Sequence, residues 1–141
     1  MFSQSPEWSL HAGLGHGTAV LGDLPLCRVL LVKDANYPWA MLVPRRPDIV
    51  EIIDLDEVAQ AQLMTEIGRT ARAVKAVTRC DKLNIAALGN AVPQLHVHVI
   101  ARRHGDAAWP RPVWGTVPPL APDTAEFEQL ADALREQIWI T

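Results

Sequence analysis

Residues 94–100 read Gln94-Leu95-His96-Val97-His98-Val99-Ile100, and polar and apolar residues alternate along this stretch. Successive side chains of a β-strand point to opposite faces, so the pattern predicts a strand with one wholly apolar face. The other face carries Gln94, His96 and His98, spaced about 7 Å apart in succession. We expect the apolar face to pack against a helix, which leaves a concentrated set of proton-transfer groups on the opposite face.

Two pairs of strands are predicted from the surrounding sequence. The β-prone residues 26–32 and 39–43 are separated by a turn, which is typical of adjacent antiparallel strands. Residues 82–87 and 95–101 are joined by a short connection and predict a second antiparallel pair. The histidine-containing stretch therefore belongs to a sheet.

Helices are predicted before, between and after these pairs. A short helix from about Pro6 is followed by a glycine-containing loop to about Asp23. A capping box at Asp54 opens a long helix that runs to about Thr78, and Asp123 caps a final helix. The order helix, two strands, long helix, two strands, helix predicts the α+β class, with helices on one side of a mainly antiparallel sheet.

Composition excludes several classes of protein. The chain has 141 residues, 49% of them hydrophobic, which suits a single globular domain with its own core. Its net charge of −3 leaves no broad basic surface for duplex nucleic acid. No apolar run approaches the roughly 20 residues that span a bilayer, and no export signal is visible, so we expect no membrane partner and a cytoplasmic location. Cys27 and Cys80 are widely separated and predict core residues rather than a disulfide or a zinc site.

The residues alone leave three interpretations of His96 and His98 open. They could lie on the solvent face of a half-exposed strand. Two imidazoles on one strand face could also bind a metal ion such as zinc, or act as a nucleophile and an oxyanion donor. The metal interpretation needs a third ligand, for which the candidates are His11, His16, Asp23, His104 and Asp106.

The stretch that begins at Gln94 and continues through Ala101-Arg102 resembles the signature of the histidine triad superfamily, whose strand alternates three histidines with apolar residues. The resemblance covers roughly residues 20–115 and is strongest to small bacterial proteins described as diadenosine tetraphosphate hydrolase-like. It implies a single histidine triad domain over residues 1–141, with a long central helix and a C-terminal helix. The flanking segments that extend it are Cys27-Arg28-Val29-Leu30-Leu31-Val32-Lys33-Asp34, Tyr37-Pro38, Leu42-Val43-Pro44-Arg45 and Gly89-Asn90-Ala91-Val92.

The resemblance implies an enzyme that acts at the α-phosphorus of a nucleoside phosphoramidate or dinucleoside polyphosphate, through a nucleotidyl-histidine intermediate. His96 takes the nucleophilic position, His98 the position that contacts a non-bridging phosphate oxygen, and Gln94 the first triad position. The implied substrate is a purine nucleotide or dinucleotide, the implied assembly is a homodimer, and no cofactor or metal is implied. The residues expected near the nucleotide and its phosphate are Gly89, Asn90, Asn84 and Asp34.

The chain also departs from the family pattern. Gln94 stands where relatives usually have a histidine, and an amide cannot transfer a proton near neutral pH. The alternative function is therefore a nucleotide-binding protein with little turnover. Asn90 and Ala91 replace the usual Gln and Ser or Thr, and Trp39-Ala40 lies where many relatives have Gly-His or Thr-His. Some relatives bring a C-terminal Trp toward the active site, while core or dimer packing is the other role open to Trp114.

Overall fold

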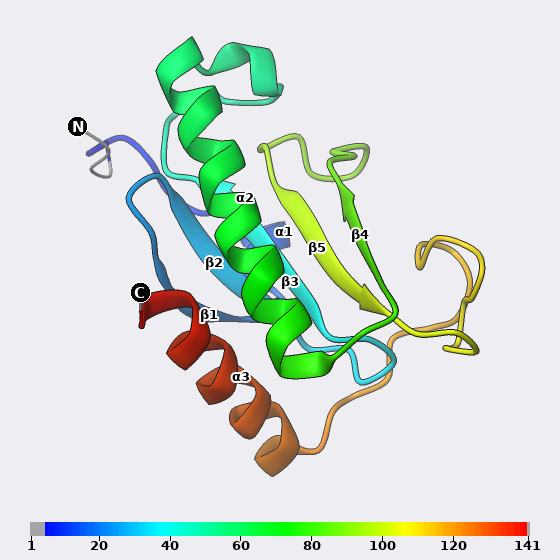
Figure 1. Cartoon of the computed structure of the whole chain (residues 1–141). Coiled ribbons are helices and arrows are strands. Elements are labelled where there is room, and N and C mark those ends of the chain that lie inside the picture. The colour runs from blue at the N-terminus through cyan, green and yellow to red at the C-terminus, as the bar shows by residue number, and fades with distance from the viewer. Residues whose placement is uncertain (1–4, 141) are drawn as a thin grey trace.

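A computed structural model describes residues 5–140 (Figure 1). Its five strands form one sheet in the order β1-β2-β3-β5-β4, with every neighbouring pair antiparallel. This arrangement confirms the predicted α+β class. No helix within these residues is long and apolar enough to cross a bilayer. The elements in chain order are α1 (Ala12–Gly15), β1 (Thr18–Asp23), β2 (Cys27–Val32), β3 (Trp39–Pro44), the 3-10 helix η1 (Ile52–Asp54), α2 (Glu57–Thr78), β4 (Lys82–Ala86), β5 (Val97–Arg102) and α3 (Thr124–Trp139).

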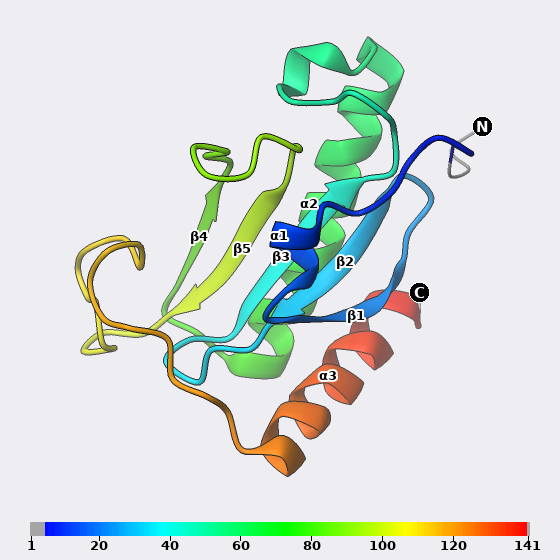
Figure 2. The ribbon, with the colours of Figure 1, turned by 180° about the vertical axis from the view of Figure 1, so that it is seen from behind.

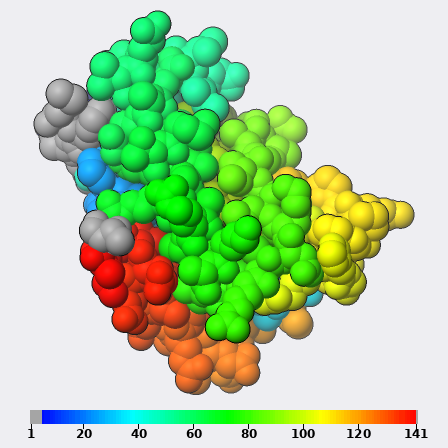
Figure 3. Space-filling model, in the orientation of Figure 1, coloured from blue at the N-terminus to red at the C-terminus, as the bar shows by residue number. Residues whose placement is uncertain are grey.

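Helices α2 and α3 cover one face of the sheet and enclose the main core (Figures 1 and 3). The apolar face of β5 packs there, as its alternating sequence predicts, and α3 also contacts α2. Each helix contributes a buried stripe at helical spacing, so burial of apolar surface holds both helices to the sheet. The core side chains from these elements are Ala59, Leu63, Ile67, Ala71 and Val74 of α2, Val97, Val99 and Ala101 of β5, and Phe127, Ala131, Leu134 and Ile138 of α3.

The two long helices are capped by aspartates. The carboxylate of Asp123 accepts a hydrogen bond from the Glu126 amide at 3.0 Å, as predicted for α3. The predicted start of α2 was wrong, because Asp54 belongs to η1 and its carboxylate accepts from the Glu51 amide. Two extended residues, Leu55 and Asp56, separate η1 from α2, and Asp56 caps the long helix instead.

The N-terminal part of the chain corrects two further predictions. The helix begins at Ala12 rather than near residue 6, and the expected loop contains β1, an edge strand paired with β2. Pairing with β2 provides this segment with backbone hydrogen bonds that its glycine-rich composition did not indicate. Gly22 lies at a bulge with φ of 158°, where a Cβ would approach the Trp139 ring to 2.9 Å. Helix α1 lies on the face opposite α2 and α3, so the helices are not confined to one side (Figure 2).

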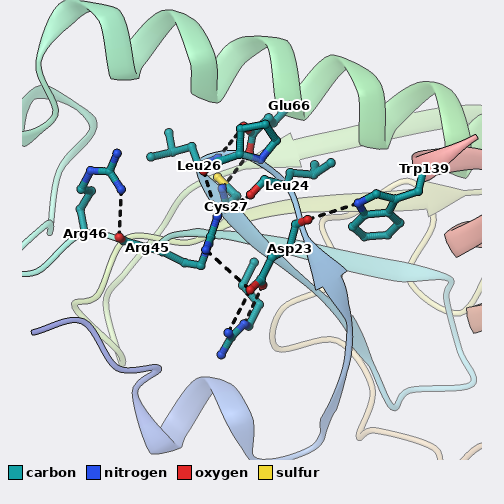
Figure 4. Close-up of polar contacts among 10 residues, drawn as sticks. Asp23, Leu24, Leu26, Cys27, Arg45, Arg46, Glu66 and Trp139 are labelled. Carbon is teal, nitrogen blue, oxygen red and sulfur yellow. Dashed lines mark hydrogen bonds and ion pairs between the residues drawn. The ribbon is translucent and has the colours of Figure 1, made fainter. Parts of the chain in front are cut away.

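A buried carboxylate links the β1–β2 turn to α2 (Figure 4). Glu66 is 1% exposed, and its two oxygens accept from the backbone amides of Leu26 and Cys27 at 2.8 and 2.7 Å. The side-chain amide of Gln62 donates to the same carboxylate at 2.6 Å. Burial and the nearby carboxylate raise the pKa of the Cys27 thiol, so Cys27 remains a neutral core residue.

Candidate active site

A cavity of about 350 Å³ opens on the face of the sheet that carries α1, which is the near face in Figure 2. Residues 13–18 form one wall, the loop 88–92 before β5 forms another, and the sheet provides the floor. Its volume falls within the range of about 300–1,000 Å³ that is usual for small-molecule sites. The side chains of the floor are Val32, Trp39, Met41, His96 and His98, with Trp114 at the edge.

The two histidines lie side by side in this cavity. His98 belongs to β5, whereas His96 immediately precedes the strand, which begins at Val97 and not at residue 95 as predicted. Their ring centroids are 4.9 Å apart, and the residues are only 7% and 5% exposed. The interpretation as polar side chains on a solvent-exposed strand face is therefore wrong.

The backbone fixes the tautomer of His96. Its Nδ1 lies 2.7 Å from the carbonyl oxygen of Gln94. A carbonyl oxygen only accepts hydrogen bonds, so Nδ1 carries the hydrogen and donates it. In the neutral ring, Nε2 then holds a lone pair and has no hydrogen-bond partner within residues 5–140. His96 therefore presents the atom that a nucleophile requires.

A tryptophan fixes the opposite tautomer of His98. The indole Nε1 of Trp39 is a donor only, and it donates to Nδ1 of His98 at 3.0 Å. The hydrogen of the neutral His98 ring is consequently on Nε2, where it is available as a donor. Burial, together with neighbouring His96, lowers the pKa of His98 to about 4, which keeps this ring neutral at physiological pH.

Aromatic rings surround His98. Trp39 lies on β3, the strand next to β5, and its ring centroid is 5.8 Å from that of Trp114. Trp114 approaches His98 edge-on, with the centroids 4.9 Å apart. The irregular segment before Trp114 packs Ala108 and Val113 onto β5, which brings this residue back to the sheet. The structure thus places Trp114 beside the histidines, and the sequence alone could not decide between this role and core packing.

The loop before β5 places two other predicted residues at the cavity. Gly89 and Asn90 both line it, and Gly89 has φ of 75°, which favours glycine. Gly89, Leu88 and His96 also line a second cavity of about 300 Å³, which Glu51 and apolar residues complete. The two cavities therefore meet at His96.

Three predicted residues lie outside the main cavity. The Gln94 amide accepts from the His11 amide at 2.8 Å and donates to the Ser9 carbonyl at 2.9 Å. Asn84 accepts from the Arg102 guanidinium at 2.7 Å. Asp34 accepts from backbone amides of its own turn and of a distant segment. Neither Asn84 nor Asp34 lines the cavity that contains the histidines.

The candidate metal ligands are not brought together. Within the part of the chain that the structure describes, no group of three or more His, Cys, Asp or Glu side chains is placed to hold a metal ion. Asp23 pairs with Arg28 at 2.8 Å. Asp106 pairs with the buried Arg102, also at 2.8 Å, and this contact lowers the pKa of the Asp106 carboxyl to about 2. These carboxylates therefore serve ion pairs within the fold.

The chain is similar to known proteins in both sequence and structure. The HIT domain matches residues 16–105. A histidine triad protein from Bradyrhizobium japonicum is 69% identical, with a TM-score of 0.93 over 95% of this chain and 100% of that one. A histidine triad protein from Sinorhizobium meliloti is 41% identical, with a TM-score of 0.90 over 93% of this chain and 97% of that one.

A sequence relative with a named activity is more distant. AP-4-A phosphorylase of Mycobacterium tuberculosis is 31% identical over an alignment of 131 residues that covers 87% of this chain. The chain spans 65% of the length of that protein. The HIT domain match covers the two cavity histidines and most of the sheet, and the two structural relatives share nearly the whole fold. This chain belongs to the histidine triad (HIT) domain family.

Proposed function

We propose that the protein binds a purine nucleotide and transfers its nucleotidyl group to His96 by displacement at the α-phosphorus. The observation that carries this proposal is the pair of complementary tautomers. His96 offers the lone pair of Nε2 for attack, and His98 offers a hydrogen on Nε2 to a phosphoryl oxygen. Since both rings are held by hydrogen bonds within the fold, little reorganisation is needed before reaction.

The proposed reaction has two steps. Nε2 of His96 forms a bond to phosphorus as the bond between phosphorus and the leaving group breaks. Water or another acceptor then displaces the nucleotide from His96 and regenerates the free imidazole. His98 stabilises negative charge on a non-bridging oxygen in both steps, and backbone amides near Gly89 and Asn90 supply further donors.

The shape of the cavity suits a nucleotide. Its apolar and aromatic side chains, Trp39 and Trp114 among them, provide surfaces on which a planar base stacks. Base–aromatic stacking contributes about 1–3 kcal/mol per base. His98 lies beside both rings, at 5.6 and 4.9 Å between ring centroids, so a base bound there would hold its α-phosphate near the histidines.

The test is intact-protein mass spectrometry after brief exposure to an adenosine phosphoramidate and, separately, to diadenosine tetraphosphate. Because one relative is an AP-4-A phosphorylase, water and inorganic phosphate are compared as acceptors by product analysis. We expect a nucleotidyl adduct on His96, or release of AMP with water and of ADP with phosphate. His96→Asn is the control and forms neither adduct nor product. If the native protein forms neither with either substrate, the proposal is overturned.

A second candidate function is nucleotide binding with little turnover. Gln94 favours it, because both polar atoms of its amide are engaged by the N-terminal segment. Saturable binding measured by calorimetry, with no product after prolonged incubation, would establish this function in place of catalysis.

We also propose that the protein is a homodimer. β4 lies at one edge of the sheet, and Ile85 on this strand is 48% exposed. Such an edge with apolar side chains is suited to burial against a second copy. Light scattering after size-exclusion chromatography should give twice the mass of one chain, and Ile85→Lys should reduce it to one. A native mass of one chain contradicts the dimer. The other large apolar side chains exposed on η1, α2 and the loop after β4 are Ile52, Ile53, Val58, Met64 and Leu88.

A further inference from the structure

Gln94, at the first triad position, forms hydrogen bonds with the N-terminal segment. Oε1 of Gln94 accepts from the backbone amide of His11 at 2.8 Å, and Nε2 donates to the carbonyl of Ser9 at 2.9 Å. Both ends of the amide are therefore used to hold residues 9–11 beside the start of β5. A leaving group that needs a proton, such as an amine, would therefore have to obtain it from a group other than Gln94.

The segment that Gln94 holds continues into a wall of the cavity. Leu14 of α1 is 3% exposed and packs with Trp8 against β2 and β3. The Thr18 hydroxyl donates to the carbonyl of Leu14 at 2.8 Å and fixes the end of the helix. His16 lies between Thr18 and the buried Leu14, at the C-terminal cap of α1, and it lines the cavity.

Three of the described residues that line this cavity have titratable side chains: His16, His96 and His98. His96 supplies the proposed nucleophile, and the tautomer of His98 is fixed by Trp39. The imidazole of His16 is exposed and makes no hydrogen bond within residues 5–140. An imidazole can donate or accept a proton at its ring nitrogens, so His16 is chemically suited to acid–base catalysis.

We propose that His16 is the general acid–base residue that compensates for Gln94, an inference that rests on the proposed nucleotidyl transfer. In the first step, the His16 imidazolium donates its proton to the leaving nitrogen or oxygen as the bond to phosphorus breaks and the bond to His96 forms. In the second step, neutral His16 takes a proton from the attacking water. The cycle consumes one water and returns both imidazoles to their starting protonation states.

Glu51 is the competing acid. It lines the second cavity, which meets the first at His96, and its side chain is exposed. The geometry favours His16 because that residue shares one cavity with both histidines. Glu51→Gln therefore belongs in the experiment as the variant that distinguishes the two.

The experiment compares two AMP derivatives with different leaving groups. An N-butyl phosphoramidate releases an amine and needs a proton, whereas a 4-nitrophenyl ester releases a stable anion and does not. His16→Gln should lower kcat/KM for the phosphoramidate by about 100-fold and for the ester by less than about threefold, because general acid catalysis assists only the poor leaving group. His104→Gln is the matched control, since this exposed histidine lies outside both cavities, and it should leave both rates unchanged.

Each other result has a definite meaning. Equal losses for the two substrates would assign His16 to binding or folding, and no loss would remove it from the reaction, so either result overturns the inference. A selective loss in Glu51→Gln instead of His16→Gln would make Glu51 the acid. If the ester reacts through His96 while His16→Gln has no selective effect, the proposed function stands and only this inference fails. If the native protein acts on neither substrate, the proposed function fails as well.

Discussion

Two buried polar clusters in this fold use their hydrogen-bonding atoms differently. Glu66 contacts the turn between β1 and β2, and both of its oxygens accept hydrogen bonds from the protein (Figure 4). His96 and His98 are almost as buried, yet the protein engages only one nitrogen of each ring. The remaining Nε2 atoms belong to side chains that line a cavity.

This difference separates a structural cluster from a candidate reactive one. A buried polar atom without a partner is costly, so folds normally satisfy such atoms. At Glu66 the fold does so, and the cluster fixes the position of a turn on α2. At the histidines the fold satisfies the nitrogens that set the tautomers, whereas the Nε2 atoms are not among its buried, unpartnered atoms and stay accessible for the proposed reaction.

The largest effect should come from the imidazole that supplies the lone pair. His96→Asn keeps an N–H donor for the Gln94 carbonyl but removes the nucleophilic nitrogen. Catalysis should fall by about ten-thousand-fold, equivalent to about 5 kcal/mol of transition-state stabilisation. Urea unfolding should show a change of about 1 kcal/mol or less. A variant that keeps its activity, or that loses stability instead, would contradict the contrast between the two clusters.

The reverse result is expected at Glu66. Glu66→Gln replaces one acceptor oxygen by an N–H group that faces a backbone donor, so the free energy of unfolding should decrease by about 3 kcal/mol. The kcat of the folded variant should stay within about twofold of the native value. Glu128→Gln, at an exposed position of α3, is the control and should change stability by less than about 0.5 kcal/mol. A large change in kcat with unchanged stability would show that Glu66 influences the reaction at the histidines and would contradict its structural role.

The pH dependence of stability tests the burial of His98. Its pKa is lowered from 6.5 to about 4 on folding, mainly by burial. Above pH 6.5 both states are neutral, whereas between 6.5 and 4 only the unfolded chain takes up the proton, so stability falls as the pH decreases through this window. From pH 7 to 5 we expect a loss of about 1–2 kcal/mol. Urea unfolding of His98→Gln should lack this part of the loss. If the native protein and His98→Gln lose the same stability between pH 7 and 5, the lowered pKa of His98 is contradicted.

The smallest effect is expected from the residue that sets the tautomer. Trp39→Phe keeps an aromatic ring but removes the donor to Nδ1 of His98, so part of the population should adopt the other tautomer. We expect kcat to fall by about tenfold, the equivalent of one hydrogen bond. Nitrogen-15 shifts of the His98 ring should report the tautomer change directly. Trp114→Phe should leave those shifts as they are and act on KM, because Trp114 contacts His98 through its ring.

Local sequence patterns predicted the elements that follow one strong periodicity. The apolar stripes of α2 and α3 and the alternation along β5 indicated the faces that pack in the core. β1 was missed because the glycines before it and Gly22 within it resemble a loop, and only pairing with β2 makes it a strand. The start of α2 was misplaced because Asp54 belongs to the short helix η1, and α2 begins after Asp56.

The α+β class and the family resemblance, with His96 and His98 at its centre, follow from the sequence, because alternation and motif spacing are local properties of the chain. The hydrogen-bond partner of each imidazole follows only from the three-dimensional fold. Trp39 reaches His98 from the neighbouring strand, and Gln94 reaches Ser9 and His11 far away in sequence. The fold also decided that Asn84 and Asp34 lie outside the cavity, while His16 and Trp114 line it. The physical reason is that hydrogen bonds and burial depend on distances between segments, which strand pairing and helix packing set after the local elements form.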